Sequence, residues 1–140
     1  MNREEATKFL VLVKVAYPSS YKNIDEMTAE ATVNMWHQTF SDVPYAIMEM
    51  AFDHFRKAST FAPTVADIYN ELKSLYYIAL SDVMTSENKV KIKLCNYIMQ
   101  HTSRYREGAG SNYEINYKSL ARLVGGKEGL FLEGGQADGN

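Results

Sequence analysis

The stretch MWHQTFSDVPYAIMEMAF, from Met35 to Phe52, contains the only tryptophan of the 140-residue chain. Trp36 and Phe40 end an apolar stripe, and the polar pair Ser41-Asp42 follows directly. Pro44 then stands where a helix can begin, because a proline in the first turn lacks only an N–H group that would have no partner. Apolar residues resume at helical spacing after it. The stretch therefore predicts two helices joined by a tight corner, with Ser41 or Asp42 capping the second.

Trp36 is better explained as a core residue than as a ligand platform. It continues a stripe in which Ala29, Val33, Trp36 and Phe40 recur at intervals of four, three and four residues. Apolar stripes at this spacing usually face a protein core. The same argument, extended along the chain, predicts a core that includes Trp36, Phe40, Pro44, Phe52, Phe55, Ile68 and Leu72.

Capping patterns mark the start of two further helices. Asn2 with Glu5 three residues later resembles a capping box, and the helix that follows should end at Pro18. Thr64 with Asp67 repeats the pattern before a long apolar stripe, with the carboxylate at the positive end of the helix dipole. We therefore expect an all-α protein, a compact bundle of about four to five helices.

A fifth helix is predicted from Ser86 or Glu87 to about Arg106, with two different faces. The expected apolar face contains Val90, Leu94, Tyr97, Ile98 and Tyr105. The expected polar face contains Lys89, Lys93, Asn96, Gln100 and Arg104.

Glycine divides the chain, since all eight glycines lie from Gly108 onward. Glycine is costly inside helices, so its absence before that point favours helical structure there. We predict a helical N-terminal module at residues 1–84 and a basic amphipathic helix at 85–107. For residues 108–140 we predict a linker (GAGS), a short helix at YKSLARLV and a flexible glycine-rich tail.

The sequence offers little for catalysis or metal binding. The sequence has no glycine-rich phosphate loop. Its single cysteine and three scattered histidines do not have the spacing of a zinc-binding cluster. Glu49 and Asp53 lie four residues apart beside His54, which suggests either a solvated polar face or, with a third ligand, a metal or acid–base site. No enzyme activity and no cofactor are expected. The lone Cys95 and the short, charged N-terminal apolar run predict a cytoplasmic protein without a membrane segment.

Two segments are candidates for partner binding. Between Glu87 and Glu107 there are five basic residues and no acidic one, although the net charge of the whole chain is −2. Lys89, Lys93 and Arg104 share a helix face that could meet nucleic acid or an acidic protein, or be an ordinary solvated surface. The apolar triplet Leu130-Phe131-Leu132 is either a docking motif or a segment that packs back on the domain.

The order and spacing of several motifs resemble a known family. These motifs are Trp36-x3-Phe40-x-Asp42-x-Pro44-Tyr45, the following Ala51 and Phe55, the run from Phe61 to Ile68, and the N-terminal NREEATKFLVLVKVAYP. Over about residues 1–80 the chain resembles the loader-and-inhibitor proteins of bacteriophage replicative helicases.

The resemblance implies an all-helical N-terminal module followed by a flexible C-terminal region. Such proteins bind the hexameric replicative helicase, hold it inactive and deliver it to an origin marked by an initiator, without a nucleotide site of their own. We therefore expect a phage or prophage replication adaptor in the bacterial host, with weak or no direct binding to nucleic acid. The alternative is a small helical DNA-binding regulator that uses the basic face of residues 86–106.

Overall fold

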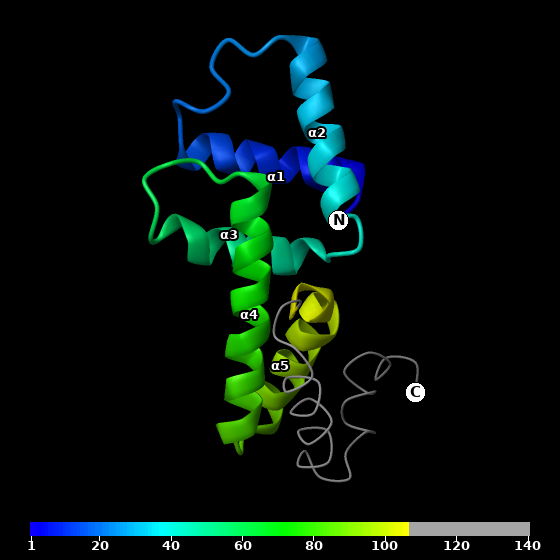
Figure 1. Ribbon diagram of the computed structural model, residues 1–140, viewed down its shortest axis with the longest axis vertical. Helices are drawn as coiled ribbons and strands as arrows, with labels where there is room; N and C mark the ends of the chain where they lie inside the picture. Colours follow the sequence, from blue (N-terminus) through cyan, green and yellow to red (C-terminus); the bar gives the residue numbers. More distant parts are fainter. Residues whose placement is uncertain (107–140) are drawn as a thin grey trace. The chain divides into compact units, whose positions relative to one another are not determined.

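The computed structural model describes residues 1–106, and every regular element in them is helical (Figure 1). The elements are α1 (Arg3–Ala16), α2 (Glu26–Phe40), α3 (Tyr45–Arg56), α4 (Val65–Thr85), α5 (Lys89–Thr102) and a 3₁₀ turn at Ser103–Arg106. The all-α prediction is confirmed. The predicted linker, short helix and tail at residues 108–140 lie outside the described residues.

The chain divides into two units, and the division falls inside α4. The first unit is Met1–Leu72 and the second is Lys73–Asn140. In the first unit, α1 contacts both α2 and α3. The prediction of functional modules at residues 1–84 and 85–107 stays a prediction.

Both predicted capping boxes are present. The Asn2 Oδ1 atom accepts from the Glu5 backbone N–H at 2.8 Å, and the Glu5 carboxylate accepts from the Asn2 N–H at 2.8 Å. Before α4, the Thr64 N–H donates to Asp67 Oδ2 at 2.9 Å, and the Asp67 N–H donates to Thr64 Oγ1 at 3.2 Å. Each pair satisfies backbone donors that a helix start leaves without an intrahelical partner.

The corner between α2 and α3 forms where the sequence predicts it, but with a different cap. Pro44 is the N-cap residue of α3, and neither Ser41 nor Asp42 caps this helix through its side chain. The prediction placed the cap too early. A cap side chain accepts from the N–H groups two or three residues ahead, and from Ser41 and Asp42 these positions come before Ala46 and Ile47, the second and third residues of α3. The Pro44 carbonyl instead accepts from the N–H groups of Ile47 at 3.0 Å and Met48 at 3.1 Å.

The N-terminal residue also lies against this corner. The Met1 nitrogen donates to the backbone carbonyls of Phe40 at 3.3 Å and Ser41 at 3.1 Å, and also to that of Val43. These contacts join the start of α1 to the end of α2. They supply donors to carbonyls that the end of a helix leaves unsatisfied.

An aromatic cluster fills the core of the first unit. The Phe9 ring lies 5.4 Å from Trp36 and 5.5 Å from Phe52, and Trp36 lies 5.6 Å from Phe40, measured between ring centroids. These separations are within the range at which aromatic pairs attract. Because the four rings come from α1, α2 and α3, the cluster holds the three helices together.

The burial of the predicted core residues follows their position along the helices. Trp36, Phe40, Phe52, Ile68 and Leu72 are buried. Pro44 and Phe55 are only partly buried. Pro44 lies at the corner before α3 and Phe55 lies in the last turn of that helix, so neither is enclosed on all sides.

Replacing Trp36 by alanine should lower the free energy of unfolding by about 3–5 kcal/mol, because truncating a buried large aromatic leaves a cavity. Urea and thermal unfolding followed by circular dichroism would measure this loss. Met35→Ala is the matched control, since the neighbouring Met35 is about half exposed. A Trp36→Ala protein as stable as the parent would show that the core does not depend on this ring.

Candidate functional site

The start of α5 is set by a side-chain cap. Asn88 is the N-cap residue, and its Oδ1 atom accepts from the backbone N–H groups of Val90 at 2.9 Å and Lys91 at 3.1 Å. The helix therefore begins at Lys89, later than the predicted start at Ser86 or Glu87. An N-cap asparagine that satisfies two donors is a stronger start signal than either earlier residue provides.

The predicted faces of α5 are partly wrong. Val90 and Leu94, which were expected on the apolar inner face, are 78% and 50% exposed. Asn96, which was expected on the polar face, is 1% exposed. The residues that α5 buries are Cys95, Asn96, Ile98, Met99 and Thr102. Two aliphatic residues therefore lie on the outside of the helix, and an amide lies inside.

The buried Asn96 explains why the sequence misassigned the faces. Neither polar atom of its side chain has a hydrogen-bond partner within the described part of the chain, and the same is true of the buried Tyr76 hydroxyl. Burying unpaired polar groups is costly, so a sequence argument places such residues outside. Packing of the remaining face, from Cys95 to Thr102, overrides this local preference.

The predicted basic residues of α5 have different environments. Lys89 and Lys93 are exposed, and within residues 1–106 neither forms an ion pair. Lys91 instead pairs with Asp82 of α4, with Nζ 3.7 Å from Oδ2. The Arg104 side chain turns to its neighbour, donating to the Tyr105 hydroxyl, with its guanidinium carbon 4.4 Å from the centre of the Tyr105 ring. Lys89 and Lys93 therefore carry the cationic character of the outer face.

His101 adds an aromatic surface to the same helix without adding charge at neutral pH. Its ring lies 4.5 Å from that of Tyr97, which is one helical turn earlier. Burial lowers the pKa of His101 below its ordinary value of 6.5, because a less hydrated site disfavours the charged imidazolium. The ring is therefore neutral at pH 7.

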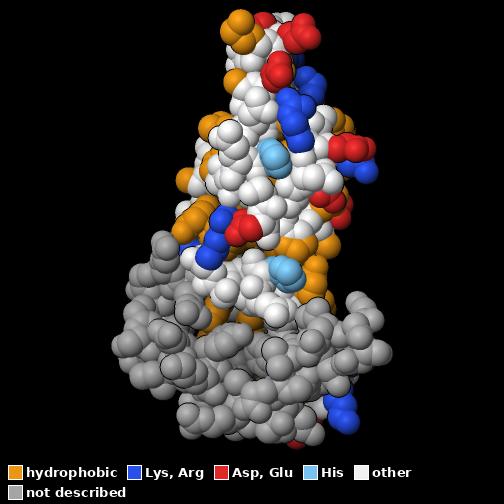
Figure 2. All heavy atoms as spheres, turned by 90° about the vertical axis from the view of Figure 1, so that its right-hand side faces the viewer, with side chains coloured by type: hydrophobic (Ala, Val, Ile, Leu, Met, Phe, Trp, Pro, Cys, Tyr) orange, Lys and Arg blue, Asp and Glu red, His pale blue; other side chains and the backbone are white. Residues whose placement is uncertain are grey.

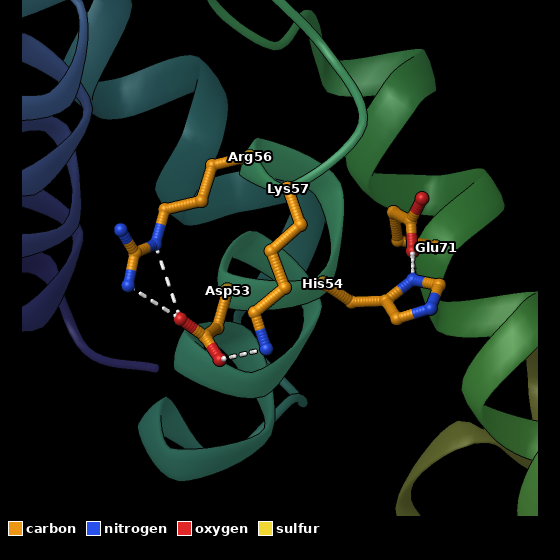
Figure 3. A network of polar contacts seen from close by, with 5 residues as sticks. All are labelled: Asp53, His54, Arg56, Lys57 and Glu71. Carbon is orange, nitrogen blue, oxygen red and sulfur yellow. Dashed lines mark hydrogen bonds and ion pairs between the residues drawn. The ribbon is translucent and has the colours of Figure 1, made fainter.

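In the other predicted polar group on α3, which consists of Glu49, Asp53 and His54, the side chains of Asp53 and His54 point in different directions (Figure 3). Asp53 accepts from Arg56 at 2.6 Å and lies 3.4 Å from the Lys57 ammonium, and the hydrogen bond from Arg56 is the main reason that its pKa is lowered. His54 points away from Asp53 toward Glu71 of α4, with Nδ1 2.5 Å from Oε2. These contacts match a solvated polar face.

Metal-binding clusters and membrane-spanning helices are both absent from the described residues. Among residues 1–106, no three His, Cys, Asp or Glu side chains gather in a way that could hold a metal ion. No helix in this part of the chain is both long and apolar enough to cross a membrane. The predicted docking triplet Leu130-Phe131-Leu132 lies outside the described residues.

Comparison with protein families bears directly on the resemblance of the N-terminal motifs. Residues 1–69 match the family model of the N-terminal domain of a phage helicase loader/inhibitor. We refer to residues 1–69, which this model matches, as the loader/inhibitor N-terminal domain. The match includes the corner motif from Trp36 to Tyr45 and the run from Phe61 to Ile68, so the resemblance is confirmed over these residues. Neither a curated protein nor a solved structure matches the chain.

The loader/inhibitor N-terminal domain also has an apolar outer surface that the sequence analysis missed. Val11, Leu12 and Val15 of α1 are 55%, 38% and 72% exposed. Leu12 and Val15 line a groove between α1 and α3, and Val11 lines another between α1 and α2. The signal was the run FLVLV, whose apolar residues cannot all fit on one face of a helix.

Charged groups on the loader/inhibitor N-terminal domain are mixed in sign. On the face shown in Figure 2, acidic and basic side chains of the described residues lie among one another, with hydrophobic side chains between them. The ion pairs Arg3–Glu30 and Arg56–Asp53 are examples of this mixing. By contrast, residues 88–106, which include α5 and lie beyond the matched residues, contain basic residues and no acidic one.

The lowered pKa of His101 predicts a pH dependence of stability. Because the folded pKa is below the unfolded value, the unfolded state binds the proton first. The free energy of unfolding should therefore decrease as the pH falls through about 6.5 toward the folded pKa. Urea unfolding between pH 7.5 and 5 would measure the slope, and His101→Gln should reduce it. An equal slope in the variant would contradict the assignment.

Proposed function

We propose that this protein is an adaptor in phage or prophage DNA replication. It binds the hexameric replicative helicase, restrains it in solution and helps to load it at the origin. The observation that carries this proposal is the loader/inhibitor N-terminal domain at residues 1–69. The protein acts by contact with other proteins in the cytoplasm of the bacterial host, and it has no catalytic or nucleotide site of its own.

The surfaces described above favour protein contact over chemistry. The first unit combines a rigid aromatic core with an exposed apolar strip on α1. The second unit exposes Lys89 and Lys93 beside Val90 and Leu94. Groups with these properties suit interfaces, which combine apolar contacts with charged residues at the rim. An origin-binding initiator is proposed as a further partner.

The contact residues proposed for the helicase lie in two segments. One is the outer face of α5 with the turn that follows it, including Lys89, Lys93 and Arg104. The other is the triplet Leu130-Phe131-Leu132, an apolar cluster flanked in the sequence by glycines and acids, which we propose as an apolar anchor. Two weak contacts on one chain bind more tightly together than either does alone, and they also permit reversible release.

The decisive test is capture of the purified replicative helicase of the same phage or host. Immobilised full-length protein should retain the hexamer, and capture is measured in parallel with and without ATP. In a separate assay, the full-length protein should lower the ATPase rate of the helicase. An unrelated hexameric ATPase is the control for non-specific capture. Retention of duplex DNA without retention of helicase would contradict the adaptor proposal and favour the DNA-binding regulator.

A chain truncated after Glu107 should remain helical and unfold cooperatively, because the stripes of all five helices lie before the cut. It should bind helicase more weakly than the full chain, since it lacks Leu130-Phe131-Leu132. Circular dichroism measures the first outcome and the capture assay measures the second. Unfolding would show that residues after Glu107 belong to the core, and full binding would place the whole contact before them.

A further inference from the structure

We propose that the outer face of α5 is a docking surface for an acidic amphipathic helix of a protein partner. This α5 face consists of Lys89, Val90, Lys93, Leu94 and Tyr97. The inference deepens the proposed function and depends on it only for the identity of the partner. The α5 face lies outside the matched residues 1–69, so it is a feature of this chain rather than of the loader/inhibitor N-terminal domain.

Helical geometry brings these five side chains together. Lys89 with Lys93, and Val90 with Leu94, are pairs four residues apart, and such pairs lie one above the other on a helix. At about 100° per residue, Tyr97 falls between the lysine row and the aliphatic row. The result is an apolar strip with a basic edge, and it is about as wide as the stripe by which an amphipathic helix packs.

The apolar half of the α5 face provides the contact area. Val90 is 78% exposed and Leu94 is 50% exposed, whereas the buried side of the same helix is already packed. Single exposed aliphatic residues are ordinary, but two at one-turn spacing form a strip that a second helix can cover. Removing this area from water would supply the main favourable free energy of docking.

The basic half selects the charge of the partner. From Asn88 to Arg106 the chain has no acidic residue, and Lys89 and Lys93 find no carboxylate within the described residues. Lys89 also lies in the first turn of α5, where the helix dipole favours negative charge. Carboxylates on a partner helix would therefore pair with both lysines and meet a favourable dipole.

Nucleic acid fits the α5 face less well. A nucleic-acid site gains its affinity from several phosphate contacts, and two lysines supply few of them. Val90 and Leu94 have no favourable interaction with a phosphate backbone. The neighbouring Arg104 is directed toward Tyr105. A partner helix with a row of leucine-like residues beside a row of glutamates would match both the apolar half and the basic half of the α5 face.

The first arm of the test uses full-length protein and a fluorescent model peptide. The peptide is an amphipathic helix of about five turns, with leucines on one face and glutamates along its edge. It should bind the parent and lose roughly tenfold or more in affinity to Lys89→Glu/Lys93→Glu and to Leu94→Ala. A peptide with lysines in place of the glutamates should not bind.

The second arm uses the purified helicase hexamer and a matched control variant. Lys22→Glu/Lys57→Glu changes the net charge equally on two exposed lysines of the first unit that lie outside α1, and it should bind helicase like the parent. Lys89→Glu/Lys93→Glu should bind more slowly, with a weaker salt dependence, because rim charges act mainly on association. Circular dichroism verifies that each variant is folded.

The outcomes separate this inference from the proposed function. If the parent does not bind the peptide, or if duplex DNA binds the α5 face more tightly than the peptide, the inference is wrong. If the peptide binds as expected but the parent captures no helicase, the docking surface stands and the adaptor function fails. If helicase binds the parent and both α5 variants equally, the adaptor stands and the α5 face is not its contact.

Discussion

The packing of Phe9 against Trp36 and Phe52 is the interaction on which the first unit depends. One ring from α1 touches one ring from α2 and one from α3, so three helices share a single cluster. The corner at residues 41–44 must then return the chain at a distance that lets Trp36 and Phe52 reach the same ring. Pro44 contributes by fixing the backbone where α3 begins.

This use of α1 has a consequence for the surface. Ala6, Phe9, Leu10 and Val13 are committed to the core. The apolar residues between and after them, Val11, Leu12 and Val15, must therefore face outward. The loader/inhibitor N-terminal domain thus combines a buried aromatic interior with an apolar exterior strip, an arrangement suited to a protein that works by binding other proteins.

The outward face of α5 arises in a comparable way. The Asn88 cap sets where the helix begins, the Lys91–Asp82 pair joins it to α4, and Cys95, Ile98 and Met99 occupy its buried side. What remains outside is a strip of aliphatic, aromatic and basic groups. Its charge at neutral pH comes from lysines, because burial lowers the pKa of His101. A constant positive charge beside exposed aliphatic groups is consistent with a surface that recognises acidic proteins.

The sequence by itself determined the helices, both capping boxes, the burial of Trp36 and Phe40, and the family of residues 1–69. These features depend on local signals that act within a few residues, namely the helical spacing of apolar residues, the N-cap residues and the positions of proline. Only the tertiary structure decided that Pro44 itself caps α3 and that α5 buries Asn96 while exposing Val90 and Leu94. The burial pattern of α5 could not be predicted from the spacing of its apolar residues alone, because these residues lie on more than one side of the helix. Which side is buried depends on how well it packs against other elements, and that packing outweighed the local cost of burying the Asn96 amide, which has no hydrogen-bond partner within residues 1–106.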